Sequence, residues 1–229
     1  MSSRLGLTMR VVDAAGYDEK RDAISHDWIR WLARHDVVPV LIPNVIESPA
    51  RYAERERLDG LILTNGNDVA GHPRSDASPQ RDATEAALLD WALAARKPVF
   101  AVCRGIHMVN AHFGGRVRAD LAADTRQPAG AHIARRHRVR FEARFAAILG
   151  APGALTNSYH RQGLLAADVA PALLAFAVCE EDGVIEGLVH RQLPVLAIQW
   201  HPEREGSCTE VDGLLLRRLL AEQVFWHGG

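Results

Sequence analysis

The sequence predicts an α/β fold in which a mostly parallel central sheet is flanked by helices, with an additional antiparallel portion in the second half. Two observations predict the parallel part: the candidate strands of the first hundred residues are apolar throughout, and amphipathic segments separate them. The antiparallel portion is predicted by segments after about residue 116 that alternate polar and apolar residues, which is typical of half-exposed strands.

The first half alternates between strand and helix signals. Ile24, Trp28, Trp31 and Leu32 recur at helical spacing, which predicts an amphipathic helix over 25–35. A second helix follows Asp82-x-x-Glu85, a pattern that resembles a capping box, and it ends before Pro98. The predicted parallel strands are the apolar runs 4–8, 37–42, 60–64 and 99–102.

The second half carries the antiparallel signals. In the run His137 to Phe141, alternation puts His137 and Val139 on one face, and Arg136, Arg138 and Arg140 on the other. Asp182-Gly183 between apolar runs predicts a hairpin turn. The run 195–200 is again a buried strand, and Thr209-x-x-Asp212 is expected to cap the closing helix.

Composition excludes several classes of partner. The chain has 229 residues with 27 Lys and Arg against 28 Asp and Glu, a net charge of −1. This balance gives no reason to expect a nucleic acid or an anionic membrane as partner. The start of the chain has no apolar core of a signal peptide, and the three cysteines form no Cys-x-x-Cys motif. We therefore expect a soluble, cytoplasmic protein without a disulfide framework.

The sharpest local feature is Cys103, which directly follows the buried strand at 99–102. Small residues lie two positions away on each side, as in the strand–elbow–helix arrangement that presents a nucleophile in α/β hydrolases. A helix N-terminus beneath the thiol would favour the thiolate. The alternative is that Cys103 is one more small buried side chain.

A second feature is the pair His201 and Glu203. In an extended segment residues i and i+2 point to the same side, and Pro202 keeps His201 in the β region. A carboxylate beside an imidazole orients it and stabilises its charged form, so His201 is a candidate base. The alternative is a solvated turn.

The third feature is the loop 65–68, which follows the strand 60–64. Ligands of open α/β sheets bind at that end of the strands. Backbone N–H groups of Gly66 and of Arg104, next to the candidate nucleophile, could donate to a developing oxyanion. An ordinary turn is the alternative.

Taken together, these segments resemble the class I glutamine amidotransferase fold in its γ-glutamyl hydrolase branch, peptidase family C26. Five segments carry the resemblance in order along nearly the whole chain: 61–69, 102–105, 157–160, 182–186 and 199–203. It implies a single flavodoxin-like domain over residues 1–229 and a catalytic triad of Cys103, His201 and Glu203. The substrate-binding residues that it implies are Asn67, His107, Asn157, Ser158, Tyr159 and His160.

Two positions depart from the family pattern. His107 stands where the family usually has a Gln that holds the glutamyl group, and Asn65-Gly66 stands where the loop usually reads Gly-Gly. The segments 21–24 and 81–85 resemble a narrower group that includes a hydrolase releasing cytidine diphosphoramidate from its γ-glutamyl conjugate in bacterial capsule pathways. For this group, arginines of the run 135–144 could hold the phosphates, although charge runs are usually plain surface.

The function expected from this resemblance is hydrolysis of a γ-glutamyl amide through a thioester on Cys103, with a small molecule as substrate. The alternatives are a γ-glutamyl-amine hydrolase of the γ-glutamyl-aminobutyrate type, or a glutaminase subunit that delivers ammonia to a separate synthase. A homodimer is left open, and no cofactor is expected. No metal is expected either, since His107/His112 and His132/His137 miss the i, i+4 spacing of helical metal pairs.

Overall fold

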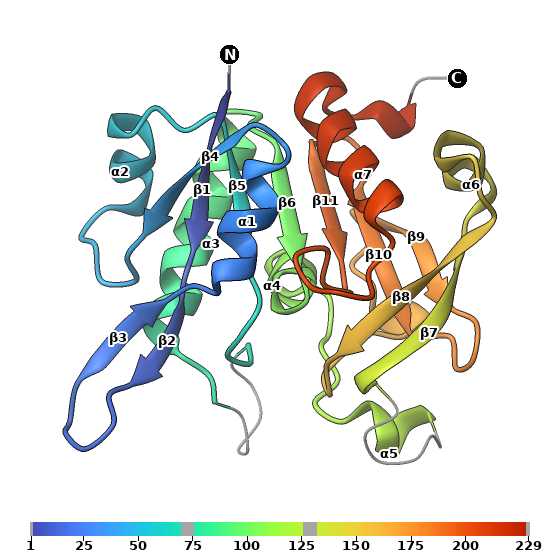
Figure 1. Ribbon diagram of the computed structural model, residues 1–229, viewed down its shortest axis with the longest axis horizontal. Helices are drawn as coiled ribbons and strands as arrows, with labels where there is room; N and C mark the ends of the chain where they lie inside the picture. The colour runs from blue at the N-terminus through green and yellow to red at the C-terminus, as the bar shows by residue number, and fades with distance from the viewer. Residues whose placement is uncertain (1, 70–75, 126–131, 228–229) are drawn as a thin grey trace.

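A nine-stranded mixed sheet forms the centre of the computed structural model, which describes residues 2–69, 76–125 and 132–227 (Figure 1). The strands follow one another across the sheet in the order β4-β1-β5-β6-β11-β10-β9-β7-β8. Their bounds are β1 Ser3–Thr8, β4 Val37–Ile42, β5 Gly60–Leu63, β6 Val99–Val102, β7 Ile133–Phe141, β8 Gly153–Tyr159, β9 Leu173–Cys179, β10 Ile185–His190 and β11 Val195–Ile198.

The two halves of the sheet differ in strand direction. The strands β4, β1, β5, β6 and β11 pair in parallel, and β10, β9, β7 and β8 continue the sheet with antiparallel pairs. The predicted fold class is therefore confirmed, including the change of direction in the second half. The predicted faces of β7 are also confirmed, since His137 and Val139 are buried whereas Arg136, Arg138 and Arg140 are exposed.

Helices cover both faces of the sheet and enclose two apolar cores. On one face, α1 (His26–Ala33), α6 (Ala143–Leu149) and α7 (Thr209–Glu222) pack around a core that includes Trp28 and Trp200. On the other, α2 (Pro49–Arg55), α3 (Pro79–Ala94) and α4 (Arg104–His112) enclose a second core. The short helix α5 (Leu121–Thr125) lies near the ends of β7 and β8.

Both expected capping patterns are wrong, because the acidic residues have tertiary partners. Helix α3 begins earlier than predicted, at Pro79, with Ser78 as its N-cap, so Asp82 and Glu85 lie inside the helix. Helix α7 follows Cys208, and the carboxylate of Asp212 instead accepts a hydrogen bond from the indole of Trp200 at 2.7 Å.

A hairpin that the sequence reasoning missed leaves the sheet beside β1. Its strands β2 (Arg10–Asp13) and β3 (Lys20–Ala23) project from the molecule near the carboxyl ends of the parallel strands (Figure 1). None of the residues of these two strands is buried, so no apolar pattern marks them in the sequence. Among the described residues, none of the helices combines the length and the apolar character that a membrane span requires.

Candidate active site

The turn between β6 and α4 presents Cys103. Its φ of 54° and ψ of −103° lie in a region that non-glycine residues rarely adopt, and such backbone strain is typical of functional sites. The turn is tight: a Cβ atom on Gly105 would lie 2.6 Å from the carbonyl oxygen of Leu63. The residue two positions after the thiol must therefore be glycine for α4 to approach β5. This geometry is that of the predicted nucleophile elbow.

A buried ionic network fastens the elbow to helix α3. The guanidinium of Arg104 contacts the carboxylates of Asp82 and Glu85, and the other oxygen of Glu85 accepts from Arg81 at 2.9 Å. Arg81 also donates to the carbonyl oxygen of Thr64 at 2.7 Å, so the network reaches the end of β5. The guanidinium of Arg104 is thus engaged with α3. The group of Arg104 that could donate to an oxyanion is its backbone N–H.

His201 follows β11, the strand that pairs with β6, and a carboxylate orients its imidazole. His201 Nδ1 is 2.8 Å from Glu203 Oε1, and both side chains are buried. Asn157 fixes the backbone of the same residue: its amide oxygen accepts from the N–H of His201 at 2.8 Å, and its NH₂ donates to the carbonyl at 2.9 Å. The remaining nitrogen, His201 Nε2, makes no hydrogen bond among the described residues.

Electrostatics favours the charged form of this imidazole. Burial opposes the charge, but the negative charges of Cys103 and Glu203 outweigh it and raise the pKa of His201 to about 9. The imidazolium at neutral pH is therefore the state that the surroundings of His201 favour. Such a group can supply the proton for a leaving group.

Cys103 and His201 share one cavity of about 430 Å³ at the carboxyl ends of the parallel strands. Ligands bind at this edge in open α/β sheets. Of the residues predicted from sequence, the cavity lining includes Cys103, His201, Gly66, Arg104, Asn67, His107, Tyr159 and His160. The lining does not include Glu203, Asn157 or Ser158.

Several of the predicted substrate-binding groups already have partners within the protein. The amide of Asn67 pairs with the backbone of Val11, at 2.8 Å and 3.0 Å, and ties the β2–β3 hairpin to the loop after β5. Ser158 Oγ donates to the carbonyl oxygen of His132 at 2.8 Å. Tyr159 is 40% exposed, and its ring meets the ring of His201 edge to face at 5.4 Å. Of the predicted substrate-binding residues on β8, Tyr159 is therefore the one best placed to contact a ligand.

His107 lies at the buried end of the cavity. Its Nε2 is 2.8 Å from the amide oxygen of Gln199, which assigns the proton to Nε2, because a carbonyl oxygen only accepts. Burial, assisted by the nearby His160, lowers the pKa of His107 to about 3. This side chain is thus a neutral group in the cavity wall, where the family pattern has an amide.

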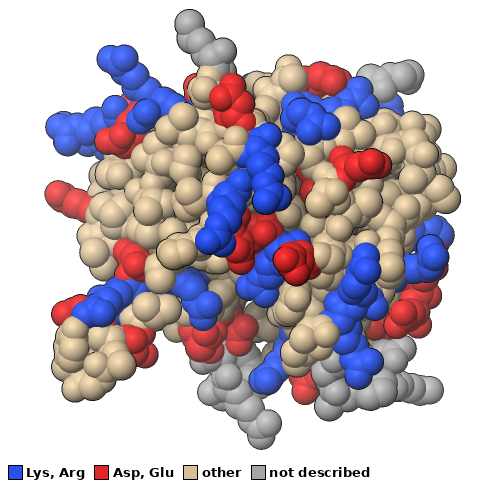
Figure 2. All heavy atoms as spheres, viewed as in Figure 1, with Lys and Arg blue, Asp and Glu red and all other residues tan. Residues whose placement is uncertain are grey.

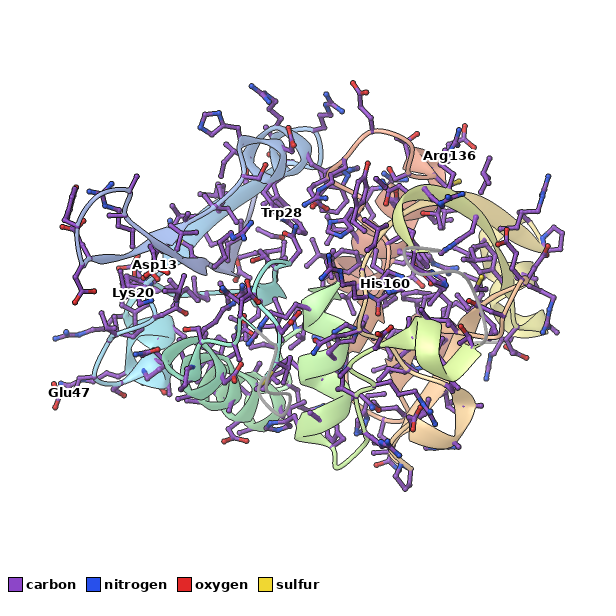
Figure 3. All side chains as sticks on the ribbon, turned by 90° about the horizontal axis from the view of Figure 1, so that it is seen from below. Asp13, Lys20, Trp28, Glu47, Arg136 and His160 are labelled. Carbon is purple, nitrogen blue, oxygen red and sulfur yellow. The ribbon has the colours of Figure 1, made fainter. Side chains whose placement is uncertain are left out.

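Three exposed or half-exposed arginines line the cavity: Arg10 from β2, Arg161 after β8, and Arg204, which follows His201 by three residues. Arg204 also stacks on the ring of Tyr159 at 4.6 Å. The arginines of the run 135–144 do not line it. Four of them are exposed on β7 and Arg144 is exposed on α6, and Figure 2 shows basic side chains over this part of the face. In the view of Figure 3, Arg136 lies near the edge of the molecule and His160 near its centre.

Sequence reasoning missed a buried polar cluster beside the cavity. His132, His137 and His160 converge on one oxygen of Glu186, in the antiparallel half of the sheet. Although burial opposes its charge, contacts with His137 and His160 lower the pKa of Glu186 to about 2. A signal was available, because the alternation in β7 places His137 on the core face.

Comparisons with known proteins bear on the family and the fold of this chain. The model of the family described as Peptidase C26 matches residues 6–203. A glutamine amidotransferase from Thermotoga maritima superposes with a TM-score of 0.65 over 96% of this chain and 99% of its own, at 13% identity. At that identity the likeness supports the fold alone.

Three curated relatives share more of the sequence. Protein NtpR of Enterococcus hirae is 33% identical over 77% of this chain and 80% of its own length. The gamma-glutamyl-CDP-amidate hydrolase of Campylobacter jejuni is 25% identical over 90% of this chain and 93% of its own. A gamma-glutamyl-gamma-aminobutyrate hydrolase of Escherichia coli O157:H7 is 29% identical, over 74% of each chain.

Proposed function

The chain belongs to the peptidase C26 family and is an amide-hydrolysing enzyme, and we propose that it cleaves a γ-glutamyl amide through a thioester on Cys103. The observation that carries the proposal is the placement of the Cys103 elbow and His201 in one cavity, with the histidine held by Glu203. These three residues are the proposed catalytic triad.

The proposed reaction has two steps. The thiolate of Cys103 attacks the γ-carbonyl carbon, and the resulting tetrahedral intermediate expels the amine, which takes a proton from His201. His201, now neutral, then removes a proton from water, and the hydroxide attacks the thioester. Glutamate leaves, and the thiolate–imidazolium pair is restored.

Two groups would serve these steps without exchanging protons. The backbone N–H groups of Gly66 and Arg104, both on the cavity lining, are the proposed oxyanion donors. Asn157 is the proposed positioning residue, since its amide holds both backbone groups of His201. Four of the predicted substrate-binding residues line the cavity, and two of these, Tyr159 and His107, are the proposed substrate contacts.

For the leaving group, we propose an anionic, phosphate-bearing amine such as cytidine diphosphoramidate. Three arginines, Arg10, Arg161 and Arg204, line the cavity together with the acidic Asp68 and Asp76. Guanidinium groups bind phosphate oxygens in a bidentate manner, so these arginines are the proposed phosphate contacts. The relative from Campylobacter jejuni, named for this kind of substrate, aligns over 90% of this chain. The arginine run on β7 has no part in this proposal.

The test compares three substrates with the purified enzyme: γ-glutamyl-CDP-amidate, γ-glutamyl-γ-aminobutyrate and glutamine, with glutamate release as the readout. We expect the highest kcat/KM for the first. Arg161→Gln should lower that value by about 10- to 100-fold, because one charge-assisted contact is lost, and should change glutamine hydrolysis far less.

Arg138→Gln is the matched control, since it removes the same charge from the outer face of β7. Hydrolysis of none of the three compounds would overturn the γ-glutamyl proposal. Equal efficiency on the first two substrates, with no effect of Arg161→Gln, would retain the reaction and favour the γ-glutamyl-aminobutyrate activity instead.

A further inference from the structure

The cluster beside the active-site cavity has the composition and spacing of a metal centre. We propose that His132, His160 and Glu186, with His137 beside them, bind a divalent transition-metal ion, Zn²⁺ in preference to harder ions. Each donor side chain is more than nine-tenths buried. One donor atom from each of His132, His160 and Glu186 lies within 4.8 Å of the others.

The distances within the cluster suit ligands of a common ion better than hydrogen-bond partners. Oε1 of Glu186 lies 3.4 Å from Nε2 of His137, 3.4 Å from Nε2 of His160 and 3.8 Å from Nδ1 of His132. Charge-assisted N–H···O bonds are shorter, about 2.7–2.9 Å. Two ligands at tetrahedral positions about 2.0–2.1 Å from zinc are separated by about 3.3–3.4 Å.

Unsatisfied polar atoms are concentrated at the same place. Five buried atoms there make no hydrogen bond among the described residues: both ring nitrogens of His137, Nε2 of His160 and both carboxylate oxygens of Glu186. Buried polar groups are almost always satisfied, so this concentration needs an explanation. A metal ion would satisfy the facing nitrogens and the carboxylate at once.

In two of the histidines, the ring nitrogen that faces away from Glu186 has the kind of hydrogen-bond partner that is found in metal-binding histidines. Nε2 of His132 is 2.7 Å from the carboxylate of Asp182, and Nδ1 of His160 is 2.9 Å from the carbonyl oxygen of Gln162. Each partner fixes the proton on the outer nitrogen and turns the lone pair of the other nitrogen inward. Carboxylate or carbonyl support of this kind is the usual second layer around a histidine ligand.

The charges also balance. Glu186 and Asp182 bring two negative charges into a site where their side chains are 0% and 2% exposed. Three neutral histidines and one divalent cation would make the cluster neutral. Two imidazoles and a carboxylate are a known zinc ligand set, which leaves a fourth position for His137 or a water molecule.

The ion would be a structural centre of the active-site wall. The ligands come from β7, from the residue after β8, from β10 and from the residue before β7. His160 lines the cavity that also holds Cys103, so a metal on its Nε2 would fix that wall. The proposal stands independently of the substrate.

The test measures zinc binding in a Cys103→Ala background, because the Cys103–His201 pair could itself bind zinc. Chelator-treated full-length protein is titrated with ZnCl₂ against a competing chelator, and bound metal is counted by mass spectrometry. We expect one zinc ion per chain and a rise in Tm on the order of 5–10 °C at saturating zinc. Co²⁺ in place of zinc should give the visible absorption of a tetrahedral centre.

Variants assign the ligands. Glu186→Gln and His160→Gln should each lower zinc affinity by about 10-fold or more. His112→Gln, at a histidine outside the cluster, should leave the affinity unchanged. Circular dichroism checks that each variant is folded.

Two results would overturn the proposal. One is that the folded Cys103→Ala protein binds no zinc, in which case protons on the histidines balance Glu186 and Asp182. The other is zinc binding that survives both Glu186→Gln and His160→Gln, or that is lost in a control variant. If Glu186→Gln does not fold, the result with His160→Gln decides, and so does the cobalt spectrum of the parent protein.

Discussion

Replacing Glu203 by Gln tests whether this carboxylate stabilises the charged form of His201. The carboxylate lies 2.8 Å from Nδ1 of His201, both side chains are buried, and the pKa of His201 is about 9. At an effective dielectric constant near 20, two unit charges at that distance attract by about 6 kcal/mol, as an upper bound. Glutamine keeps the shape and loses the charge. We expect the pKa of His201 to fall by about 2, or about 2.7 kcal/mol.

The assay is the pH dependence of kcat for glutamate release. In the wild type the imidazolium is present below its pKa and is lost as pH rises through about 9, so the basic limb should lie near pH 9. In Glu203→Gln this limb should move to about pH 7, with kcat at neutral pH lower by about 10²–10³. His201→Ala should lose more. A Glu203→Gln variant with an unmoved basic limb, or one less active than His201→Ala, would refute the assigned roles.

Three further predictions concern the scaffold of the site. Gly105→Ala should destabilise the protein by about 1–3 kcal/mol in urea unfolding and reduce activity, because the new Cβ would meet the carbonyl oxygen of Leu63; wild-type stability would contradict the tight elbow. Glu85→Gln should cost about 3–5 kcal/mol in the same measurement, since Arg104 would lose a buried partner; a loss below about 1 kcal/mol would contradict the network. Burial raises the pKa of Asp212 to about 7, so the folded state keeps a proton that the unfolded chain loses near pH 4, and this group's contribution to stability falls as pH rises from about 4 to 7. Asp212→Asn should therefore have a higher Tm than the wild type at about pH 8 but not at about pH 4, and an equal difference at both would exclude this titration.

The elements of the parallel half could be predicted because each depends on local sequence. An apolar strand followed by Cys103, and another followed by the loop at Gly66, both end at one edge of a parallel sheet. That topology brings Cys103 and the Gly66 loop together independently of how the helices pack. The i, i+2 geometry of His201 and Glu203 is likewise local, and the structure places the two side chains in contact as expected.

What could not be predicted depends on contacts between distant segments. The i, i+3 spacing of Asp82 and Glu85 fits a capping box, and it fits equally well two positions inside a helix that both contact Arg104. Only the tertiary fold distinguishes these two arrangements. The spacing rule for helical metal pairs did not apply to His132 and His160, because antiparallel pairing of β7 with β8 joins them. The alternation in β7 marks His137 as buried, but residue spacing along the chain does not show that His132, His160 and Glu186 meet it.

The central claim is the thioester on Cys103, and rapid quenching tests it most directly. The enzyme is mixed with a γ-glutamyl amide, stopped in acid within the first turnover, digested, and mapped by mass spectrometry. We predict the added mass of one γ-glutamyl group on the peptide that contains Cys103, and none in Cys103→Ala. Full glutamate release with no adduct on that peptide, or an adduct on another residue, would contradict the account.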